Sequence, residues 1–321
     1  MRMYVLNQHG LQPDVTEANL AEFHAVQTGV IWIDVHHPTP KSVSKLQEVM
    51  KLHPLAVEDA FHQRERPKFE EYPNHMFIVV NDIVLRHQEL EFPELDIFVG
   101  IDYVITVHYR CYEKMERVRE RLLNSEIKRP FTTAYIFHTI IDTIVDGYFF
   151  PLNLIDDELD AMVEHVVAKP SATVQARLFE LKRMLHRTWF ILGYERDLLN
   201  MVLRHEAKFG PGSEILQYYM RDVQDHLTLV TDIVISHREN LNSIIDLYLS
   251  SSNMQLNLTV NRLTVVTIVI GVLTVIGGFY GMNFEETWPP FDAPWGIPFV
   301  IAVMIVSGGV IVWLLRRWRV Y

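Results

Sequence analysis

Cysteine is almost absent from this chain of 321 residues, in which Cys111 is the single thiol. One thiol cannot close a disulfide within the chain, so a disulfide-stapled secreted fold is excluded and a reducing compartment is favoured. Residues 1–10 also contain no apolar segment of signal-peptide length. Insertion into a membrane must therefore rely on segments further along the chain.

The short motifs that mark many enzymes are missing too. The sequence has no P-loop, no G-x-G-x-x-G and no G-x-S-x-G, and its fifteen histidines form no H-E-x-x-H pattern. Internal repeats and low-complexity segments are likewise absent. We therefore expect neither an enzyme nor an organic cofactor.

Positive charge is scarce, since 29 Lys and Arg face 40 Asp and Glu and leave a net charge of −11. Residues 261–321 hold four Arg against three acids, so the preceding part carries −12. This acidity argues against a nucleic-acid partner. It fits a protein that handles divalent cations, and it equally fits plain solubility.

Charge of either sign is missing from two long segments near the C-terminus. Leu263 to Tyr280 are eighteen uncharged residues, and Trp295 to Leu315 are twenty-one more. At about 1.5 Å per residue, each helix would cross most or all of a hydrocarbon core roughly 30 Å thick. The sequence predicts a transmembrane helical hairpin, which by hydropathy alone could also be a simple anchor for a soluble domain.

The loop between the two spans, residues 281–294, lacks Lys and Arg. The outer flanks are basic, with Arg262 before the first span and Arg316, Arg317 and Arg319 after the second. The positive-inside rule then predicts that both flanks are cytoplasmic and that the loop faces outward. The protein is expected in the inner or plasma membrane as a multi-pass protein with both termini in the cytoplasm.

The first hundred or so residues have the pattern of an α/β domain. Short helices are expected over 41–50 and 55–61, and Gly100-Ile101-Asp102 favours a hairpin turn between the last two strands. The β-rich runs are residues 3–6, 30–35, 76–85, 95–99 and 103–108.

Long helices are expected from about Glu113 onward. Apolar residues recur at helical spacing over 132–168 and again over 172–208. A third helix begins after Gly210-Pro211-Gly212 and meets no proline from Ser213 to Trp288. If it runs unbroken to Tyr280 it has 68 residues and a length of about 100 Å, so it must leave the first domain as a stalk and enter the membrane.

Polar and small residues form one stripe along this third helix. They recur at intervals of seven, four, seven, seven, three and four, which keeps them near one face of an α-helix. In an oligomer this face would point to the axis, although small residues in membrane helices also serve close packing. The stripe consists of Asp246, Asn253, Asn257, Thr264, Gly271, Thr274 and Gly278.

The segment Tyr280-Gly281-Met282-Asn283, followed by Phe284-Glu285, resembles the signature of the CorA-type divalent-cation channels. The similarity extends from Leu52 to the C-terminus, and it includes His53 to Ala60 and Gln63 to Lys68. It implies a homopentamer whose first transmembrane helix lines a pore and whose second faces membrane lipid. The expected fold is thus an α+β membrane protein with an N-terminal α/β cytoplasmic domain, a helical stalk and two transmembrane helices.

The same resemblance implies roles for individual residues. Gly281, Met282 and Asn283 would form the selectivity filter. The family often carries Met-Pro-Glu-Leu after this motif, whereas this chain has Thr-Trp-Pro-Pro at 287–290, so the acids expected outside the filter are instead Glu285, Glu286 and Asp292. Leu263 falls at an apolar constriction, whereas Val260 and Gly271 stand where several family members have bulky methionines. The acidic pair Glu58 and Asp59 would bind regulatory Mg²⁺ with Asp222 of an adjacent subunit. The pore-lining positions are Asp246, Asn257, Leu263, Gly271, Thr274 and Gly278.

A ring of Asn283 amides suits Mg²⁺, which is small, prefers oxygen ligands and loses water reluctantly. Amide carbonyls can accept hydrogen bonds from its hydration shell without a charge that would trap the ion.

The expected function is a channel for Mg²⁺ that is gated by cytoplasmic Mg²⁺ and that also passes Co²⁺ and Ni²⁺. Two alternatives are a zinc-transporting branch of the superfamily, against which Met282 argues, and a membrane-anchored metal sensor that conducts nothing. The chain is expected to have seven parts: the α/β domain (1–112), cytoplasmic helices (113–212), the stalk (213–262), the pore helix (263–280), the outer loop (281–294), the second transmembrane helix (295–315) and a basic tail (316–321).

Overall fold

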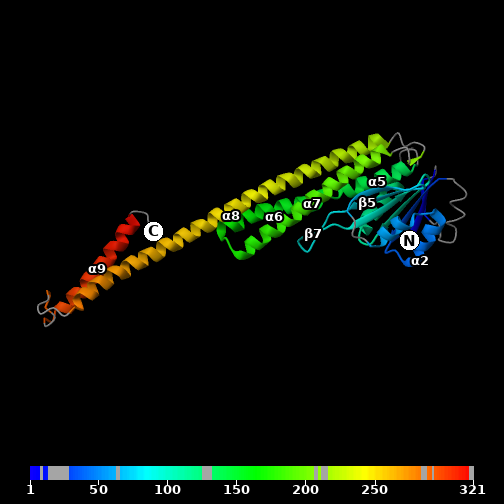
Figure 1. Ribbon diagram of the computed structural model, residues 1–321. Coiled ribbons are helices and arrows are strands. Elements are labelled where there is room, and N and C mark those ends of the chain that lie inside the picture. Colours follow the sequence, from blue (N-terminus) through cyan, green and yellow to red (C-terminus); the bar gives the residue numbers. More distant parts are fainter. Residues whose placement is uncertain are drawn as a thin grey trace. The chain divides into compact units, whose positions relative to one another are not determined.

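The computed structural model describes residues 1–7, 10–13, 29–62, 66–124, 132–205, 209–210, 216–282, 288–290 and 293–317. The chain divides into two compact units (Figure 1). The first unit comprises Met1–Glu164 and Thr173–Ile244, and the second comprises His165–Ala172 and Ile245–Tyr321.

A seven-stranded mixed sheet forms the centre of the first unit, with the order β2-β1-β3-β9-β8-β5-β4. β3 and β9 pair in parallel, and the other neighbouring strands pair antiparallel. The expected hairpin at residues 100–102 is confirmed, because β8 and β9 are antiparallel and the Gly100 amide donates to the Tyr103 carbonyl at 2.9 Å. The strands are β1 Arg2–Asn7, β2 Gly10–Pro13, β3 Val30–His36, β4 Lys68–Glu71, β5 Met76–Asn81, β8 Glu94–Val99 and β9 Tyr103–His108, and a separate ribbon holds β6 Val84–Arg86 and β7 Glu89–Glu91.

Helices cover both faces of this sheet, which is why its central strands read as nearly continuous apolar runs. On one face α2, Pro40–Met50, and α3, Pro54–His62, pack their apolar side chains against alternate residues of the strands. α2 starts where the Thr39 side chain accepts from the Ser42 amide, with Pro40 in its first turn. On the other face α4, Tyr112–Leu123, contacts β2, and α5, Thr133–Asp146, contacts β9.

The single helix predicted over 132–168 is wrong, because the structure has two helices there. α5 ends at Asp146, Gly147 caps it, and α6 runs over Phe149–Ala168. Pro151 lies in the first turn of α6, where its missing N–H leaves no helical hydrogen bond unmade. The run predicted as one strand over 76–85 is likewise divided, since β5 ends at Asn81 and β6 begins at Val84.

The long helices of the first unit pack against each other through apolar side chains at heptad spacing. α8, Leu216–Tyr280, is one uninterrupted helix of 65 residues, so the predicted unbroken helix is confirmed from Leu216. Its buried positions are separated alternately by four and three residues, which is the seam of a coiled-coil-like packing. They are Leu216, Met220, Val223, Leu227, Val230, Val234, His237, Leu241 and Ile244.

The facing helix α7, Ala172–Arg204, repeats the pattern through Leu178, Leu181, Leu185, Thr188, Leu192, Glu195, Leu199 and Val202. Polar contacts at the seam edges link the three helices. The Arg177 guanidinium of α7 pairs with Glu158 of α6 at 2.5 Å, and His237 of α8 lies 3.3 Å from Asp156 of α6.

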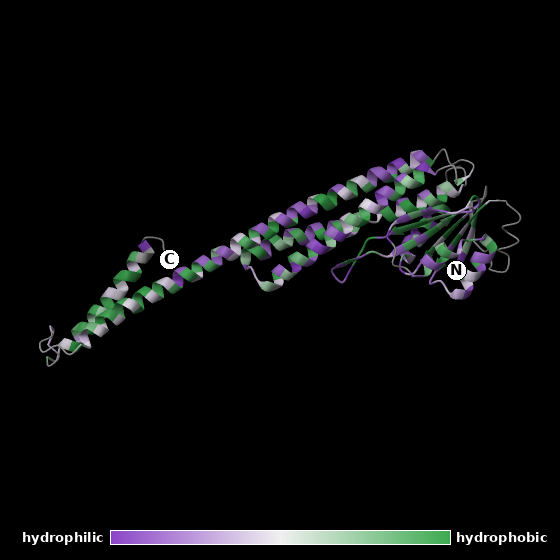
Figure 2. Ribbon diagram, viewed as in Figure 1, coloured by the Kyte–Doolittle hydropathy of each residue, from purple (hydrophilic) through white to green (hydrophobic). Residues whose placement is uncertain are grey.

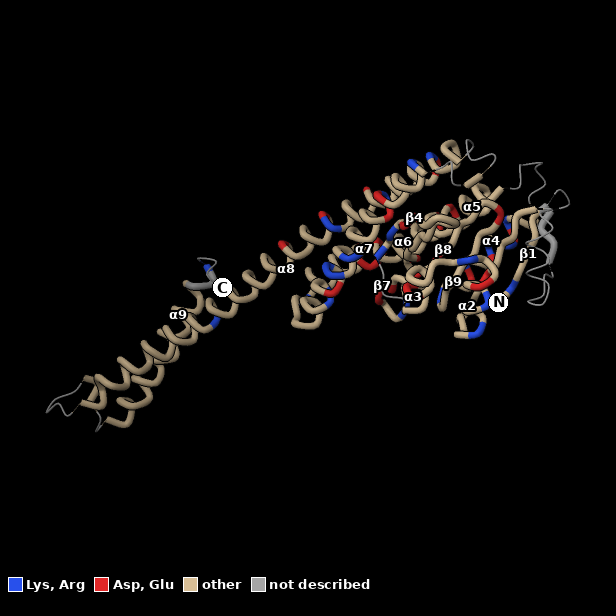
Figure 3. The backbone as a smooth tube through the Cα atoms, turned by 45° about the vertical axis from the view of Figure 1, so that its right-hand side comes forward, with Lys and Arg blue, Asp and Glu red and all other residues tan. Residues whose placement is uncertain are grey.

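Two helices of the second unit are long and apolar enough to cross a membrane: the last part of α8, and α9, Gly296–Arg317. Figure 2 shows both as predominantly hydrophobic, and Figure 3 shows basic residues only where the pair approaches the stalk, with no Asp or Glu along it. They pack closely at glycines: a side-chain carbon added at Gly277 would lie 3.7 Å from Met304, and one at Gly308 would lie 3.9 Å from Val269.

Candidate functional site

The polar stripe of α8 lies on the face turned away from α9. Val269 and Gly277 contact α9, whereas no other heavy atom lies within 4 Å of a side-chain carbon added at Gly271 or Gly278. At about 100° per residue, Val269 is about 160° around the helix from Gly271. All seven stripe positions from Asp246 to Gly278 are exposed in the single chain. Within the part of the chain that the structure describes, the stripe is therefore not packed against another segment.

The threonines of the stripe use their hydroxyl protons within the helix. Thr264 donates to the Val260 carbonyl and Thr274 donates to the Ile270 carbonyl, both at 2.8 Å. This back-bonding satisfies the donor in an apolar surrounding and leaves oxygen lone pairs directed outward. The stripe thus presents acceptor oxygens, which is the ligand type that hard cations take.

Where α8 ends, its last backbone groups are satisfied locally. The Gly281 amide donates to the Gly277 carbonyl at 2.9 Å, and the Met282 amide donates to the Phe279 carbonyl at 3.3 Å. A side-chain carbon at Gly281 would lie 3.2 Å from the Gly277 carbonyl oxygen, so the close turn favours glycine. Gly281 and Met282 are exposed, and the predicted site residues Asn283, Glu285, Glu286 and Asp292 lie outside the described residues.

The predicted regulatory acids occupy two separate helices of the first unit. Glu58 and Asp59 are in α3, and Asp222 is exposed in the first two turns of α8. Glu58 is exposed, whereas Asp59 is half-buried and pairs with the Lys68 ammonium at 2.6 Å. Among the described residues, the ligand atoms of these three acids do not gather within 4.8 Å of one another in the single chain.

One cluster of possible metal ligands was missed in the sequence. Single ligand atoms of Asp142, Asp146 and His226 lie within 4.8 Å of one another. The two aspartates are four residues apart on α5, which is a signal that the sequence contains. Arg121 already pairs with Asp142 at 2.5 Å and lies 3.9 Å from Asp146, so one cation of the chain faces both carboxylates of this cluster.

A second group that the sequence did not reveal is the buried carboxyl of Glu195 in the α7 seam. The Tyr148 hydroxyl oxygen lies 2.8 and 2.9 Å from its two oxygens and 2.6 Å from the Asn81 carbonyl, and the Asn81 amide donates to Glu195 at 3.1 Å. Burial raises the pKa of Glu195 from 4.5 to about 8.

The neutral form of Glu195 satisfies this network completely. Tyr148 has one hydroxyl proton and faces three acceptors, so it cannot donate to all of them. If the carboxylic acid donates to the Tyr148 oxygen, the tyrosine donates to the Asn81 carbonyl and each group has a partner. The proton of Glu195 therefore links α7 to the end of β5 and to the break between α5 and α6.

A pH-dependent stability follows from the raised pKa. Between pH 4.5 and 8 the folded chain holds a proton that the unfolded chain releases, so the contribution is present below pH 4.5 and is lost as the pH rises to 8. Glu195→Gln keeps a donor and an acceptor at this position and does not titrate. As the pH rises from 4.5 to 8, wild type loses this stabilisation and the variant does not, so the melting temperature of the variant should rise relative to that of wild type. The corresponding change in the free energy of unfolding of wild type between pH 4.5 and 8 is on the order of a few kcal/mol.

Circular-dichroism melts of the full chain in detergent at pH 5 and pH 8 measure this difference. The exposed Glu164→Gln is the matched control and should follow wild type at both pH values. An equal pH dependence in Glu195→Gln and wild type would contradict the assignment.

The sequence was compared with known proteins. Residues 27–317 match the family described as "CorA-like Mg2+ transporter protein". The chain is 32% identical to the cobalt/magnesium transport protein CorA of Thermotoga maritima over 273 residues, which cover 84% of this chain and 77% of that protein.

Two solved structures share the fold. The complete CorA magnesium transporter of Methanocaldococcus jannaschii is 21% identical and superimposes with a TM-score of 0.79, covering 98% of this chain and 97% of that one. The full-length CmaX protein is 20% identical, with a TM-score of 0.74 over 99% of this chain and 97% of that one. Both have the order of α/β domain, long helix and two apolar helices found here.

Proposed function

The chain belongs to the family of CorA-like Mg²⁺ transporter proteins, and we propose that it is a channel that passes Mg²⁺, and also Co²⁺ and Ni²⁺, across a membrane. The observation that carries this proposal is the polar stripe of α8. It presents acceptor oxygens on the face opposite α9, and it leads to the Gly281-Met282-Asn283 motif at the helix end.

A pore requires several copies of this helix, and we propose a homopentamer. Support comes from the part of α8 that follows the heptad seam. After Ile244 the seam stops, yet large apolar side chains continue and are exposed, among them Leu249, Met254, Leu256 and Leu263, the last at 65%. Exposed apolar side chains on a helix before its membrane span favour self-association. Leu263 would then form the apolar constriction around the axis.

Selectivity is assigned to a ring of Asn283 amides at the outer end of the pore helix, beside Gly281 and Met282. The stripe positions Asp246, Asn257, Gly271, Thr274 and Gly278 line the path, and the acids Glu285, Glu286 and Asp292 raise the cation concentration outside it.

Regulation is assigned to Mg²⁺ held between neighbouring subunits by Glu58, Asp59 and Asp222. Carboxylates gathered at an interface repel one another, and a hard divalent ion offsets this repulsion. The Lys68 pairing neutralises part of Asp59, so Glu58 and Asp222 supply most of the uncompensated charge.

Flux into liposomes made with the purified protein tests the function. We expect Mg²⁺ entry driven by an inside-negative potential, with competition from Co²⁺ and Ni²⁺ and little from Zn²⁺. Dominant Zn²⁺ flux would place the chain in the zinc-transporting branch, and metal binding without flux would indicate a sensor.

The orientation gives a topological prediction, in which both termini are cytoplasmic and residues 285–293 face outward. It rests on the basic flanks Arg262, Arg316, Arg317 and Arg319. An impermeant maleimide should label Thr287→Cys in intact cells, and native Cys111 adds little background because it is buried. The control Asp197→Cys, exposed on α7, should react only after lysis. Labelling of position 287 only after lysis would reverse the topology.

A further inference from the structure

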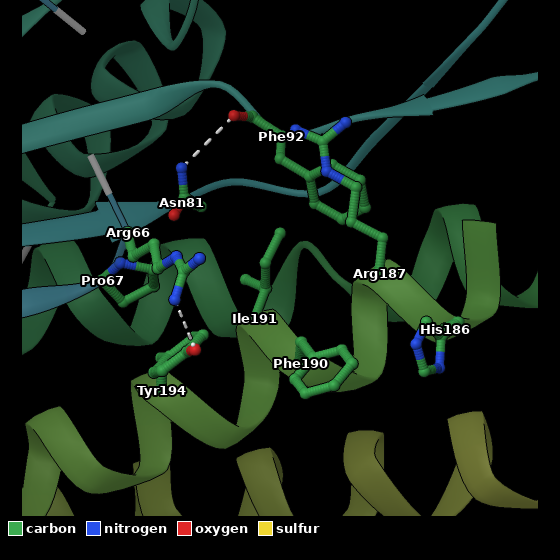
Figure 4. Close-up of a pocket in the computed structure, with 9 residues that line it drawn as sticks. All are labelled: Arg66, Pro67, Asn81, Phe92, His186, Arg187, Phe190, Ile191 and Tyr194. Atoms are coloured by element: carbon green, nitrogen blue, oxygen red, sulfur yellow. Dashed lines mark hydrogen bonds between the residues drawn. The ribbon is translucent and has the colours of Figure 1, made fainter. Parts of the chain in front are cut away.

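A cavity of about 620 Å³ opens in the first unit between α7 and the edge of the α/β domain (Figure 4). Its volume is that of a small-molecule site. One wall is a single face of α7, which carries Arg187, Phe190 and Tyr194 at intervals of three and four residues. The other wall brings Arg66, just before β4, and Phe92, just after β7. None of these residues has a part in the proposed ion path or the regulatory site.

The charge of this cavity is opposite to that of the chain. Its described lining contains two arginines and no Asp or Glu, in a protein whose net charge is −11. Neither guanidinium has a carboxylate within 4.0 Å among the described residues, since no ion pair includes Arg66 or Arg187. A guanidinium fork without a carboxylate suits a phosphate or carboxylate of a ligand.

Aromatic rings hold both guanidinium groups in place. The Arg187 guanidinium lies 4.7 Å from the centre of the Phe92 ring, and the Arg66 guanidinium lies 5.4 Å from the centre of the Tyr194 ring. Arg66 also donates to the Tyr194 hydroxyl at 2.8 Å. Because these contacts restrict the side chains before any ligand arrives, less conformational entropy is lost on binding.

Between the two arginines the cavity offers a flat apolar surface. Figure 4 shows Arg66 and Arg187 on either side of Ile191 and Phe190. Phe190 is 45% exposed, which is high for a large aromatic residue on a helix that packs on its neighbours. The rings of His186 and Trp189 lie nearly perpendicular to it, with ring centres 4.8 and 5.1 Å away, so neither of them is stacked parallel to Phe190.

We propose that this cavity binds a nucleoside phosphate, with the base stacked on Phe190 and the phosphate held by Arg187 and Arg66. Inorganic phosphate alone would leave most of the volume and the aromatic surface unused. An uncharged aromatic compound that covered the two guanidinium groups would displace their water without supplying an anion in its place, which is costly. A ligand with both a flat ring and a phosphate can contact the apolar surface at Phe190 and the two guanidinium groups at the same time.

Equilibrium binding of ADP and of inorganic phosphate to the full-length protein in detergent tests the proposal. The buffer contains EDTA, because phosphate oxygens also coordinate Mg²⁺. Without a chelator, ADP bound through Mg²⁺ at a metal site could not be told from ADP bound in the cavity. We expect saturable ADP binding, with inorganic phosphate weaker by about tenfold or more because it lacks the stacking contribution of the base. No saturable ADP binding, or equal affinity for phosphate, would overturn the proposal.

Variants on α7 locate the binding. Arg187→Gln and Phe190→Ala are expected to weaken ADP binding by about tenfold each. Both residues are exposed, so neither change should disturb the fold, and melting curves verify this. The matched control is Arg196→Gln, an exposed arginine nine residues along and therefore on the opposite side of α7. ADP binding that is unchanged in both cavity variants would place the ligand elsewhere and refute the assignment.

Discussion

Asn283→Ala is expected to abolish Mg²⁺ flux, or to reduce it to about a hundredth or less, while the oligomer still assembles. The amide ring is the proposed first contact for hydrated Mg²⁺, and alanine replaces it with an apolar collar. Hydrated Mg²⁺ gives up its water reluctantly, so an entrance without acceptors leaves no favourable route past it. Binding of water by an amide is weak enough for the ion to leave again, which a carboxylate ring would not allow as readily.

The measurement is Mg²⁺ entry into liposomes, with the oligomer size checked by light scattering. Asn153→Ala is the matched control, because it removes an exposed amide from α6 far along the chain from the motif. It should keep the wild-type rate. Normal flux in Asn283→Ala would reject the role of this residue in selectivity.

Removal of the three regulatory acids is expected to abolish inhibition by cytoplasmic Mg²⁺ and leave conduction intact. A ligand shifts an equilibrium between closed and open states only by its different affinity for the two. Without the carboxylates of Glu58, Asp59 and Asp222 the ion has no such preference. In the triple variant Glu58→Gln, Asp59→Asn, Asp222→Asn, the current should stay uninhibited up to at least about ten times the Mg²⁺ concentration that half-inhibits wild type.

The structure allows a sharper ranking of these acids. Lys68 lies 2.6 Å from Asp59 and 3.4 Å from Glu70, so Asp59→Asn alone removes a charge that is already partly compensated. The double variant Glu58→Gln, Asp222→Asn should therefore reproduce most of the effect of the triple variant, and Asp59→Asn should have less. Current recorded from membrane patches against internal Mg²⁺ gives the comparison.

The exposed Asp157→Asn on α6 controls for the loss of one negative charge and should be inhibited like wild type. Inhibition of the triple variant at the wild-type Mg²⁺ concentration would show that these residues are not the sensor.

Much of the secondary structure was predictable because its signals are local. The hairpin at Gly100 and the uninterrupted α8 both follow from the order of residues along a short stretch. The break at Gly147 was not predicted, since the apolar spacing continues across it and Pro151 is tolerated in a first helical turn. The Gly281-Met282-Asn283 motif was identified from the amino-acid sequence, and Asn283 itself lies outside the described residues.

The heptad seams of α7 and α8 are also written in the sequence, yet Glu195 and His237 interrupt them with polar side chains. Both are buried here because their positions in the repeat face neighbouring helices. In the sequence, a polar residue at such a position indicates that the apolar pattern is interrupted. Only its partner in the fold shows that the residue is buried. The partners of Glu195 are Tyr148 and Asn81, which lie 47 and 114 residues away along the chain.

The sequence by itself determined the two uncharged spans, the proline-free helix that leads into the first of them, and the polar stripe along that helix. Composition and periodicity decide these features, because a helix repeats every 3.6 residues whatever packs against it. Tertiary structure alone decided that the stripe lies opposite α9, that Lys68 compensates Asp59, and that Arg66 and Arg187 share one cavity. These depend on contacts between distant segments, whose distances and burial arise only when the chain has packed.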